Sequence, residues 1–256
     1  MSSFNIIGTW TLFQRESRRF LRVKMQTIVA PALTAILYLI VFRYAMGDRE
    51  VPGLDVDYFS FLIPGLMMMA MLQNAFANTS SSMIVGKVMN VHVFLLMSPI
   101  SASEVIFALL AAAVLRALVV GGVLLLILLP FSELALAHVW MILFYGVCGS
   151  LIMGSLGLIG GMWSKTFDDM AMVNNFVVMP LTFLSGVFYS VTQLPPFWQA
   201  VNAWNPFFYL IDGFRHGFIA TGDSDPLQAM GAVAILTLLS VLLAWYLWRI
   251  GWKLKE

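Results

Sequence analysis

The sequence predicts an all-α, polytopic membrane protein with six transmembrane helices, an amphipathic helix before the first and short helices before the last. Two observations predict this fold class. Of 256 residues, 61% are hydrophobic and 11% charged, against about 45–50% and about 25% in soluble domains. So much apolar surface cannot be buried in a soluble particle of this size, which excludes soluble enzymes, nucleic-acid binders and disordered chains. Second, six apolar runs are long enough to cross a bilayer, and backbone in lipid must bond within its own segment.

The six runs divide one transmembrane domain, residues 1–256, into helices of about 20 residues. We expect spans at about 25–46, 58–80, 105–129, 139–163, 171–189 and 227–248. The first run starts too late and is too long for a cleaved signal peptide, so we predict that it is retained as a span.

Basic residues are concentrated on one side of these spans. That side holds Arg15, Arg18, Arg19, Arg22, Lys24, Lys87, Lys165, Arg249, Lys253 and Lys255. The other side holds Arg43, Arg49 and Arg215 together with the acids Asp48, Glu50, Asp55, Asp57, Glu133, Asp212, Asp223 and Asp225. Because Lys and Arg favour cytoplasmic loops, both termini are predicted to be cytoplasmic.

Residues 4–24 have the pattern of an amphipathic helix. Its apolar side would carry Ile6, Trp10, Phe13, Phe20 and Leu21, and its opposite side Arg15, Arg18, Arg19 and Arg22. Aromatic residues suit the acyl boundary and arginines suit the headgroups. The helix is either an anchor that sets the topology or an elbow that docks on a cytoplasmic partner.

The longest cytoplasmic loop, 81–104, contains Lys87 and His92 and then a short apolar stretch, 93–97, which Pro99 ends. This stretch could form a helix across the cytoplasmic face that presents apolar residues to another protein. Ser101 and Glu104 have capping-box spacing. In the short loop 164–169, Thr166 or Asp168 could cap the fifth span, and we expect Asp168 and Asp169 to act there as capping acids near its positive end.

The outer loop 190–226 is rich in aromatic residues. Pro195-Pro196 and Asn205-Pro206 are signals that start helices, so we predict two short helices at the outer leaflet. Asp212 and Arg215 are three residues apart and can pair on one helical face. They form either a self-contained ion pair or, with Phe197, Trp198 and Tyr209, an exit gate.

Arg116 is the one full charge near the middle of a span, where an uncompensated charge costs a few kcal/mol. It could reach the headgroups, bind backbone carbonyls or contact an anionic substrate. The span 139–163 is rich in glycine at small-xxx-small spacing, which predicts close helix packing.

The sequence carries no phosphate-loop motif, no catalytic triad and no metal-ligand spacing. We therefore predict that this chain is not an enzyme, has no catalytic or metal site and holds no cofactor. Two functions that a membrane chain of this kind could have are those of a carrier or channel driven by ions and of an intramembrane enzyme acting on lipids. The scarcity of intramembrane acids disfavours the carrier, and the lack of a catalytic His- or Asp-rich loop disfavours the enzyme.

Several segments together resemble the type-2 ATP-binding-cassette (ABC) exporter permeases of the bacterial inner membrane. The residues that carry the resemblance are Ile63-Pro64-Gly65-Leu66-Met67-Met68, Asn74-Ala75-Phe76-Ala77-Asn78, Met97-Ser98-Pro99-Ile100, Lys165-Thr166-Phe167-Asp168-Asp169, Gly186-Val187-Phe188-Tyr189-Ser190, Leu194-Pro195-Pro196-Phe197-Trp198 and Asn205-Pro206 followed by Tyr209, Gly213, Phe214 and Arg215. Each motif is weak alone, but they occur in the family's order over most of the chain.

The resemblance implies a homodimer with two separate ABC ATPase subunits, which would bind the ATP and Mg. The N-terminal helix and the loop 87–101 would transmit the motion of the ATPases, through Arg15, Arg18, Arg19, Lys87, His92, Met97, Ser98, Pro99 and Ile100. The substrate would leave along the dimer interface. Related permeases export polysaccharides, lipo-oligosaccharides, lipids or drugs. The chain departs from many relatives in having His92 and Val93 where they carry acids.

Overall fold

The structure is a computed structural model that describes residues 4–46, 51, 54, 56–131, 134 and 136–254. Its long elements are all helices. They are α1 (Ile6–Arg22), α2 (Ala30–Met46), α3 (Tyr58–Val88), α4 (His92–Met97), α5 (Ala102–Leu128), α6 (Val139–Trp163), α7 (Phe167–Val173), α8 (Met179–Leu184), α9 (Pro196–Ala203), α10 (Pro206–Ile219) and α11 (Pro226–Ile250). The predicted all-α fold class is confirmed. The charges at Asp48, Arg49, Glu50, Asp55, Glu133, Lys255 and Glu256 lie outside the described residues.

Five helices in the described chain are long and apolar enough to cross a membrane. They are Met25–Ala45, Tyr58–Val88, Ala102–Phe131, Val139–Trp163 and Pro226–Ile250, which match five of the six predicted spans. The stretch predicted at 171–189 is different. It consists of α7, a π-helical turn (Asn174–Val178) and α8, and it ends at Leu184, before Gly186 adopts a left-handed φ of 73°.

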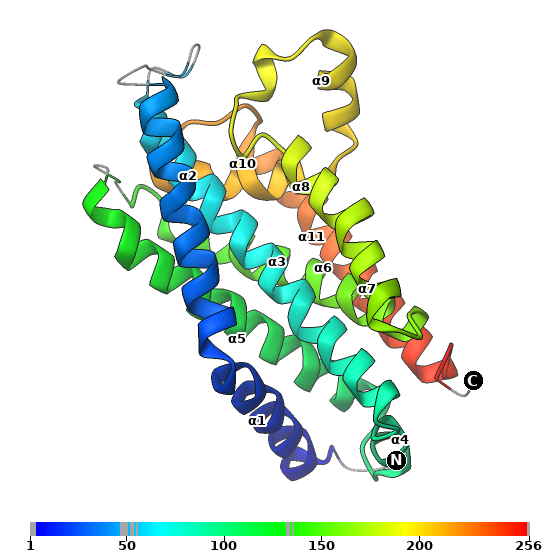
Figure 1. Ribbon diagram of the computed structural model, residues 1–256. Coiled ribbons are helices and arrows are strands. Elements are labelled where there is room, and N and C mark those ends of the chain that lie inside the picture. The colour runs from blue at the N-terminus through cyan, green and yellow to red at the C-terminus, as the bar shows by residue number, and fades with distance from the viewer. Residues whose placement is uncertain are drawn as a thin grey trace.

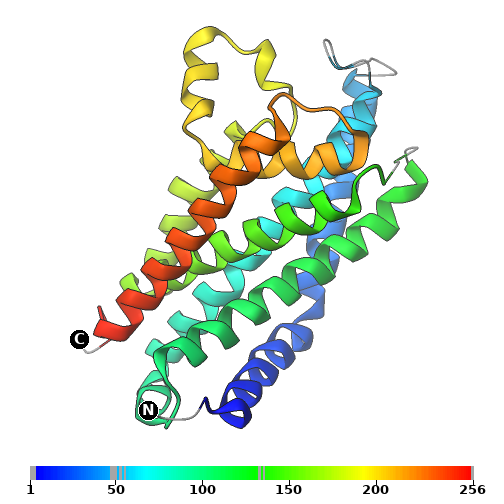
Figure 2. The same cartoon turned by 180° about the vertical axis from the view of Figure 1, so that it is seen from behind.

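The bundle is built around α3, which packs against α5, α6 and α10. Most residues of α3 are buried, whereas α2 and α11 leave most of theirs exposed. Helices α1 and α4 lie at one end of the bundle and α9 and α10 at the other, as Figures 1 and 2 show from opposite sides. The described basic residues of the predicted cytoplasmic side gather at the end that holds α1, α4 and the final turn of α11.

Glycines bring α6 into direct contact with the backbone of α3. The hydroxyl of Thr79 donates to the carbonyl of Gly154 over 2.7 Å. A Cβ atom at Gly157 would lie 2.4 Å from the carbonyl oxygen of Phe76, and one at Gly161 would lie 2.6 Å from the Cβ of Met83. The close packing predicted for this span is confirmed.

Gly157→Ala is therefore expected to destabilise the bundle, by about 1–3 kcal/mol, because backbone rather than a flexible side chain blocks the added methyl group. Gly122→Ala is the matched control, since nothing lies within 4 Å of a Cβ there. Thermal unfolding of both variants in nanodiscs measures the difference. Equal midpoints would show that α6 can move away from α3 at no cost.

Candidate functional site

Helix α1 is fastened to the start of α5. Its Leu12 and Phe20 are buried, and α1 packs along α5. The backbone N–H of Asn5 donates to Glu104, whose other oxygen accepts from the N–H of Ser101 over 2.6 Å. The predicted capping box is confirmed, and the same carboxylate also holds α1.

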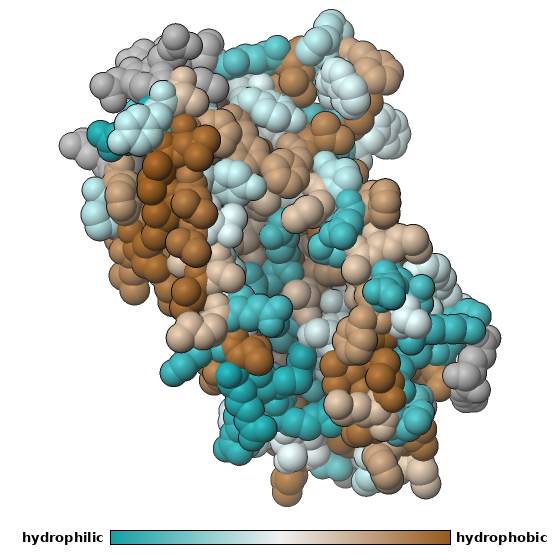
Figure 3. Space-filling view, in the orientation of Figure 1, coloured by the Kyte–Doolittle hydropathy of each residue, from teal (hydrophilic) through white to brown (hydrophobic). Residues whose placement is uncertain are grey.

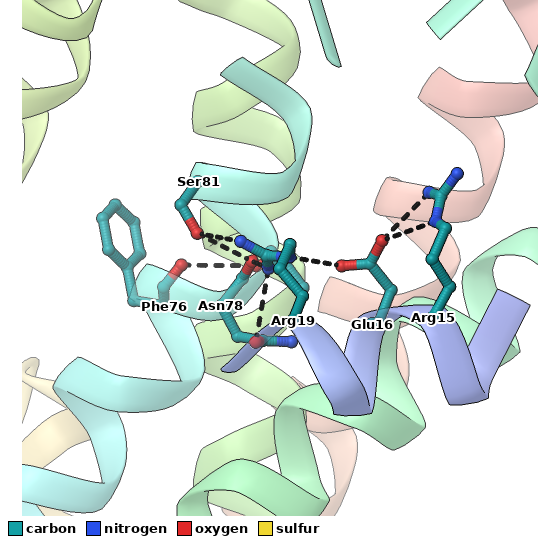
Figure 4. A network of polar contacts seen from close by, with 7 residues as sticks. Arg15, Glu16, Arg19, Phe76, Asn78 and Ser81 are labelled. Carbon is teal, nitrogen blue, oxygen red and sulfur yellow. Dashed lines mark hydrogen bonds and ion pairs between the residues drawn. The ribbon is translucent and has the colours of Figure 1, made fainter. Parts of the chain in front are cut away.

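The buried carboxylate of Glu16 organises the arginines of α1 (Figure 4). It pairs with Arg15 and with Arg19, each at 2.9 Å. Arg19 also donates to the carbonyl of Asn78 over 2.6 Å and to the hydroxyl of Ser81 over 2.8 Å. This network ties α1 to α3, so the two helices must move together. Glu16 was not predicted as part of the site, although a lone acid among four arginines was a usable signal.

The apolar side predicted for α1 is divided in the structure. Ile6, Trp10 and Leu21 are exposed, as a side facing the acyl boundary would be, whereas Phe20 is buried together with Leu12 and Glu16. The exposed apolar side faces away from the described chain.

A cleft of about 490 Å³ lies between α1 and the end of α3. Four arginines, Arg15, Arg18, Arg19 and Arg22, line it. Beside it, α4 confirms the short helix expected in the loop. Phe94 is 73% exposed and Met97 is 78% exposed. This end of the molecule therefore offers two apolar side chains next to a basic cleft.

Other residues of this loop are engaged inside the chain. The ammonium of Lys87 donates to the carbonyls of Met162 and Ser164 over 2.6 and 2.8 Å, where it caps α6. The ring of His92 lies 3.2 Å from the carbonyl of Gly86. Ile100 is partly buried against the cluster that holds α1.

The start of α7 is capped by Thr166, whose hydroxyl accepts from the N–H of Asp169, and by Asp169 itself, which confirms the prediction for Asp169 but not for Asp168. The N–H groups of Lys165 and Thr166 donate to the Asp169 carboxylate over 2.9 and 3.0 Å, and these bonds lower its pKa. Asp168 is exposed.

Half-way along α3, Arg116 of α5 is buried against Asn74. Its Nε and Nη2 both donate to the Asn74 side-chain oxygen, over 3.1 and 2.9 Å. The three environments predicted for Arg116 did not include a side-chain amide. A groove of about 230 Å³ runs beside Asn74, between α2 and α3. Figure 3 shows polar side chains along the middle of this face, to the right of the apolar column formed by α2.

At the other end, α9 and α10 begin at the predicted prolines. The two short helices differ in burial. Phe197 and Trp198 of α9 are exposed, whereas α10 packs among α3, α6 and α11. Tyr209, at the junction, donates its hydroxyl to the carbonyl of Ala203 over 3.0 Å.

The predicted pair of Asp212 and Arg215 is confirmed and fully buried, with 3.8 Å between Oδ1 and Nη1. The guanidinium lies 3.6 Å from the ring centroid of Phe61. It donates to the carbonyl of Phe61 over 3.1 Å and to that of Gly186 over 2.7 Å.

The carboxylate of Asp212 holds the loop after α10. It accepts from the N–H groups of Asp223 and Ser224, each over 2.9 Å, and from the Ser224 hydroxyl over 2.6 Å. Asp223 in turn accepts from Val191 over 2.7 Å, and burial raises its pKa. These contacts join α3, α10, the segment after α8 and the loop after α10, which gives the pair a structural function.

Residues 8–219 match the model of the family described as ABC-2 type transporter. The chain belongs to this family. It is 36% identical to the inner membrane transport permease YadH of Escherichia coli K12, over 96% of each chain. The YadH of Shigella flexneri is equally similar. The polysialic acid transport protein KpsM of Escherichia coli is 25% identical, over 93% of this chain and 91% of that protein.

The resemblance found in the sequence is thus confirmed, and the chain is an ABC-2 transport permease with transmembrane helices. The structure divides the predicted coupling residues into two sets. Met97, Pro99, Arg15 and Arg18 are exposed. Lys87, His92, Ser98, Ile100 and Arg19 are bonded or packed within the permease itself.

Proposed function

We propose that this ABC-2 permease is the transmembrane subunit of an ATP-driven exporter in the bacterial inner membrane. It would form a homodimer and bind two separate ATPase subunits, which hold the ATP and Mg. The observation that carries the proposal is the exposed apolar pair Phe94 and Met97 beside the basic cleft of α1. An ATP-driven permease needs a surface that binds its ATPase. Next to this apolar pair, α1 is hydrogen-bonded to α5 and to α3, so that a displacement of the surface can reach the bundle.

The membrane topology follows from the same arrangement. We place the end with α1 and α4 in the cytoplasm, since it gathers the basic residues. The stretch predicted at 171–189, which contains the end of α7 and all of α8, would serve as the fifth of six spans. Both termini are then cytoplasmic.

The transmission path in this proposal runs from the ATPase to α4 and α1 and from there to α3. Arg19 and Glu16 supply the connection to Asn78. Asn74, which holds Arg116, lies one helical turn from Asn78 on α3. A displacement of α1 would therefore be passed to the middle of the bundle.

The substrate in this proposal is amphipathic, and of the polysaccharide, lipid or drug-like kind. It would be moved out of the cytoplasm or the inner leaflet, past Phe197 and Trp198 at the outer end. The alternative function is an ion-coupled carrier or channel that needs no ATPase.

Co-purification tests the proposal. The permease, extracted from membranes in a mild detergent, is expected to retain the ATPase encoded next to it and to stimulate ATP hydrolysis in proteoliposomes. If no ATPase accompanies the chain and adding the neighbouring one yields no hydrolysis, the exporter proposal fails. Flux driven by an ion gradient alone would then support the carrier.

A further inference from the structure

The groove between α2 and α3 is polar although both helices are apolar spans. Five of the residues that line it carry an amide or hydroxyl group, namely Gln26, Thr34, Tyr38, Gln73 and Asn74. Polar side chains at membrane depth are costly, and they often line substrate pathways. The groove is also open on the face seen in Figure 3.

One hydrogen-bond donor of this groove is unused. The Nε2 atom of Gln73 is buried and has no partner among the described residues. Leaving such a donor unpaired costs about 1–3 kcal/mol. The neighbouring amide differs, because Asn74 both donates to the carbonyl of Ala70 over 3.0 Å and accepts from Arg116. Because Gln73 lines the groove, a rotation of its side chain would let this donor pair with an acceptor oxygen bound there.

The charge beside the groove is positive. Arg116 lies directly behind Asn74, and within the described part of the chain its two hydrogen bonds both go to this uncharged amide. None of the described residues that line the groove is an Asp or Glu. An amide oxygen leaves the charge of the guanidinium uncompensated, and its field is weakly screened away from water. The groove therefore favours anions and disfavours cations.

We propose that this groove binds the oxygen-rich, anionic head group of the substrate, a hydroxylated group that carries a carboxylate or phosphate. Gln73 donates to it, Thr34 and Tyr38 exchange hydrogen bonds with its hydroxyls, and Arg116 stabilises its negative charge through Asn74. This inference rests on the proposed function, because it assumes that the permease exports a substrate, and it specifies the chemistry of that substrate. It excludes organic cations, which the broader proposal admits.

Binding to the full-length permease in phosphatidylcholine nanodiscs tests the groove, with no ATPase present. The soluble probes are tetragalacturonate, maltotetraose and tetraphenylphosphonium, and added phosphatidylglycerol probes a lipid source of the same chemistry. We expect saturable binding of tetragalacturonate or phosphatidylglycerol, and at least about tenfold weaker binding of maltotetraose and of the cation. Competition between the two anions tells a free glycan from a lipid headgroup.

Three variants locate the binding. Gln73→Leu removes the unused donor, and Gln73→Glu places a negative charge in the groove, which repels an anionic ligand. Each variant is expected to bind the anion at least about tenfold more weakly. Gln228→Leu makes the same change at an exposed position on α11 and is expected to bind as the parent does. Thermal unfolding of each variant checks that the fold is retained.

Two results would overturn the proposal. One is saturable binding of neither anion, and the other is equal anion affinity in Gln73→Leu and Gln228→Leu. These outcomes are independent of the ATPase experiment. If the anion binds but no ATPase assembles with the permease, the proposed function fails, whereas the assignment of anion binding to the groove is retained.

Discussion

Replacing Phe94 and Met97 together by Asp is expected to abolish ATPase binding while the permease still folds. Both side chains are more than 70% exposed on α4, so the change removes little packing within the permease. Buried apolar residues at an interface are worth about 2 kcal/mol or more each when they are hot spots. Desolvating two carboxylates adds to that cost, so we expect affinity to fall at least about 100-fold. The measurements are co-purification and titration of the purified ATPase against permease in nanodiscs.

Two further variants separate loss of contact from loss of fold. Phe94→Leu with Met97→Leu keeps the apolar surface and is expected to retain binding. Ile100→Asp is expected to lower the unfolding temperature instead, because Ile100 packs so close to α1 that a Cβ at Gly8 would lie 3.1 Å from its Cγ1. Normal assembly of the double Asp variant would show that α4 is not the contact with the ATPase.

Arg215→Met is expected to cause a large loss of stability, about 3–5 kcal/mol, as is typical when one partner of a buried ion pair is removed. The buried Asp212 carboxylate would lose its counter-charge, and the carbonyls of Phe61 and Gly186 would lose a donor. We expect lower yield of folded protein and a lower midpoint of thermal unfolding in detergent.

Arg249→Met is the matched control for this experiment. Arg249 is exposed, and its guanidinium lies over the ring of Trp245 at 5.2 Å. Such a contact is worth about 0.5–1 kcal/mol at exposed sites. Equal unfolding midpoints for Arg215→Met and Arg249→Met would contradict the structural function of the Asp212–Arg215 pair.

Features that depend on neighbouring residues in the chain were predictable. Run lengths gave five spans, the prolines at 196 and 206 gave the starts of α9 and α10, and Ser101 with Glu104 gave the cap of α5. The stretch predicted at 171–189 lies earlier in the chain, from Phe167 to Leu184, and the left-handed turn at Gly186 follows its end. The hydrophobicity of a run of residues does not predict where its backbone changes direction.

The candidate site was predictable as a set of residue types but not as a set of partners. The exposed stretch on α4 was expected, yet Lys87 in the same loop caps α6 through Ser164, 77 residues away. Arg116 was singled out, yet its partner Asn74 was one of many polar residues in the spans. The sequence did not predict a function for Gln73, because the feature that distinguishes it is a buried Nε2 atom without a hydrogen-bond partner among the described residues.

The sequence by itself therefore determined that this protein is an α-helical membrane permease, where most of its helices begin and which end gathers its basic residues. These properties depend on composition and on contacts within a few residues. Only the tertiary structure decided which charges remain exposed for a partner and which are used inside the bundle. A charge within an apolar chain must find a partner, and that partner is selected by helix packing across long sequence separations.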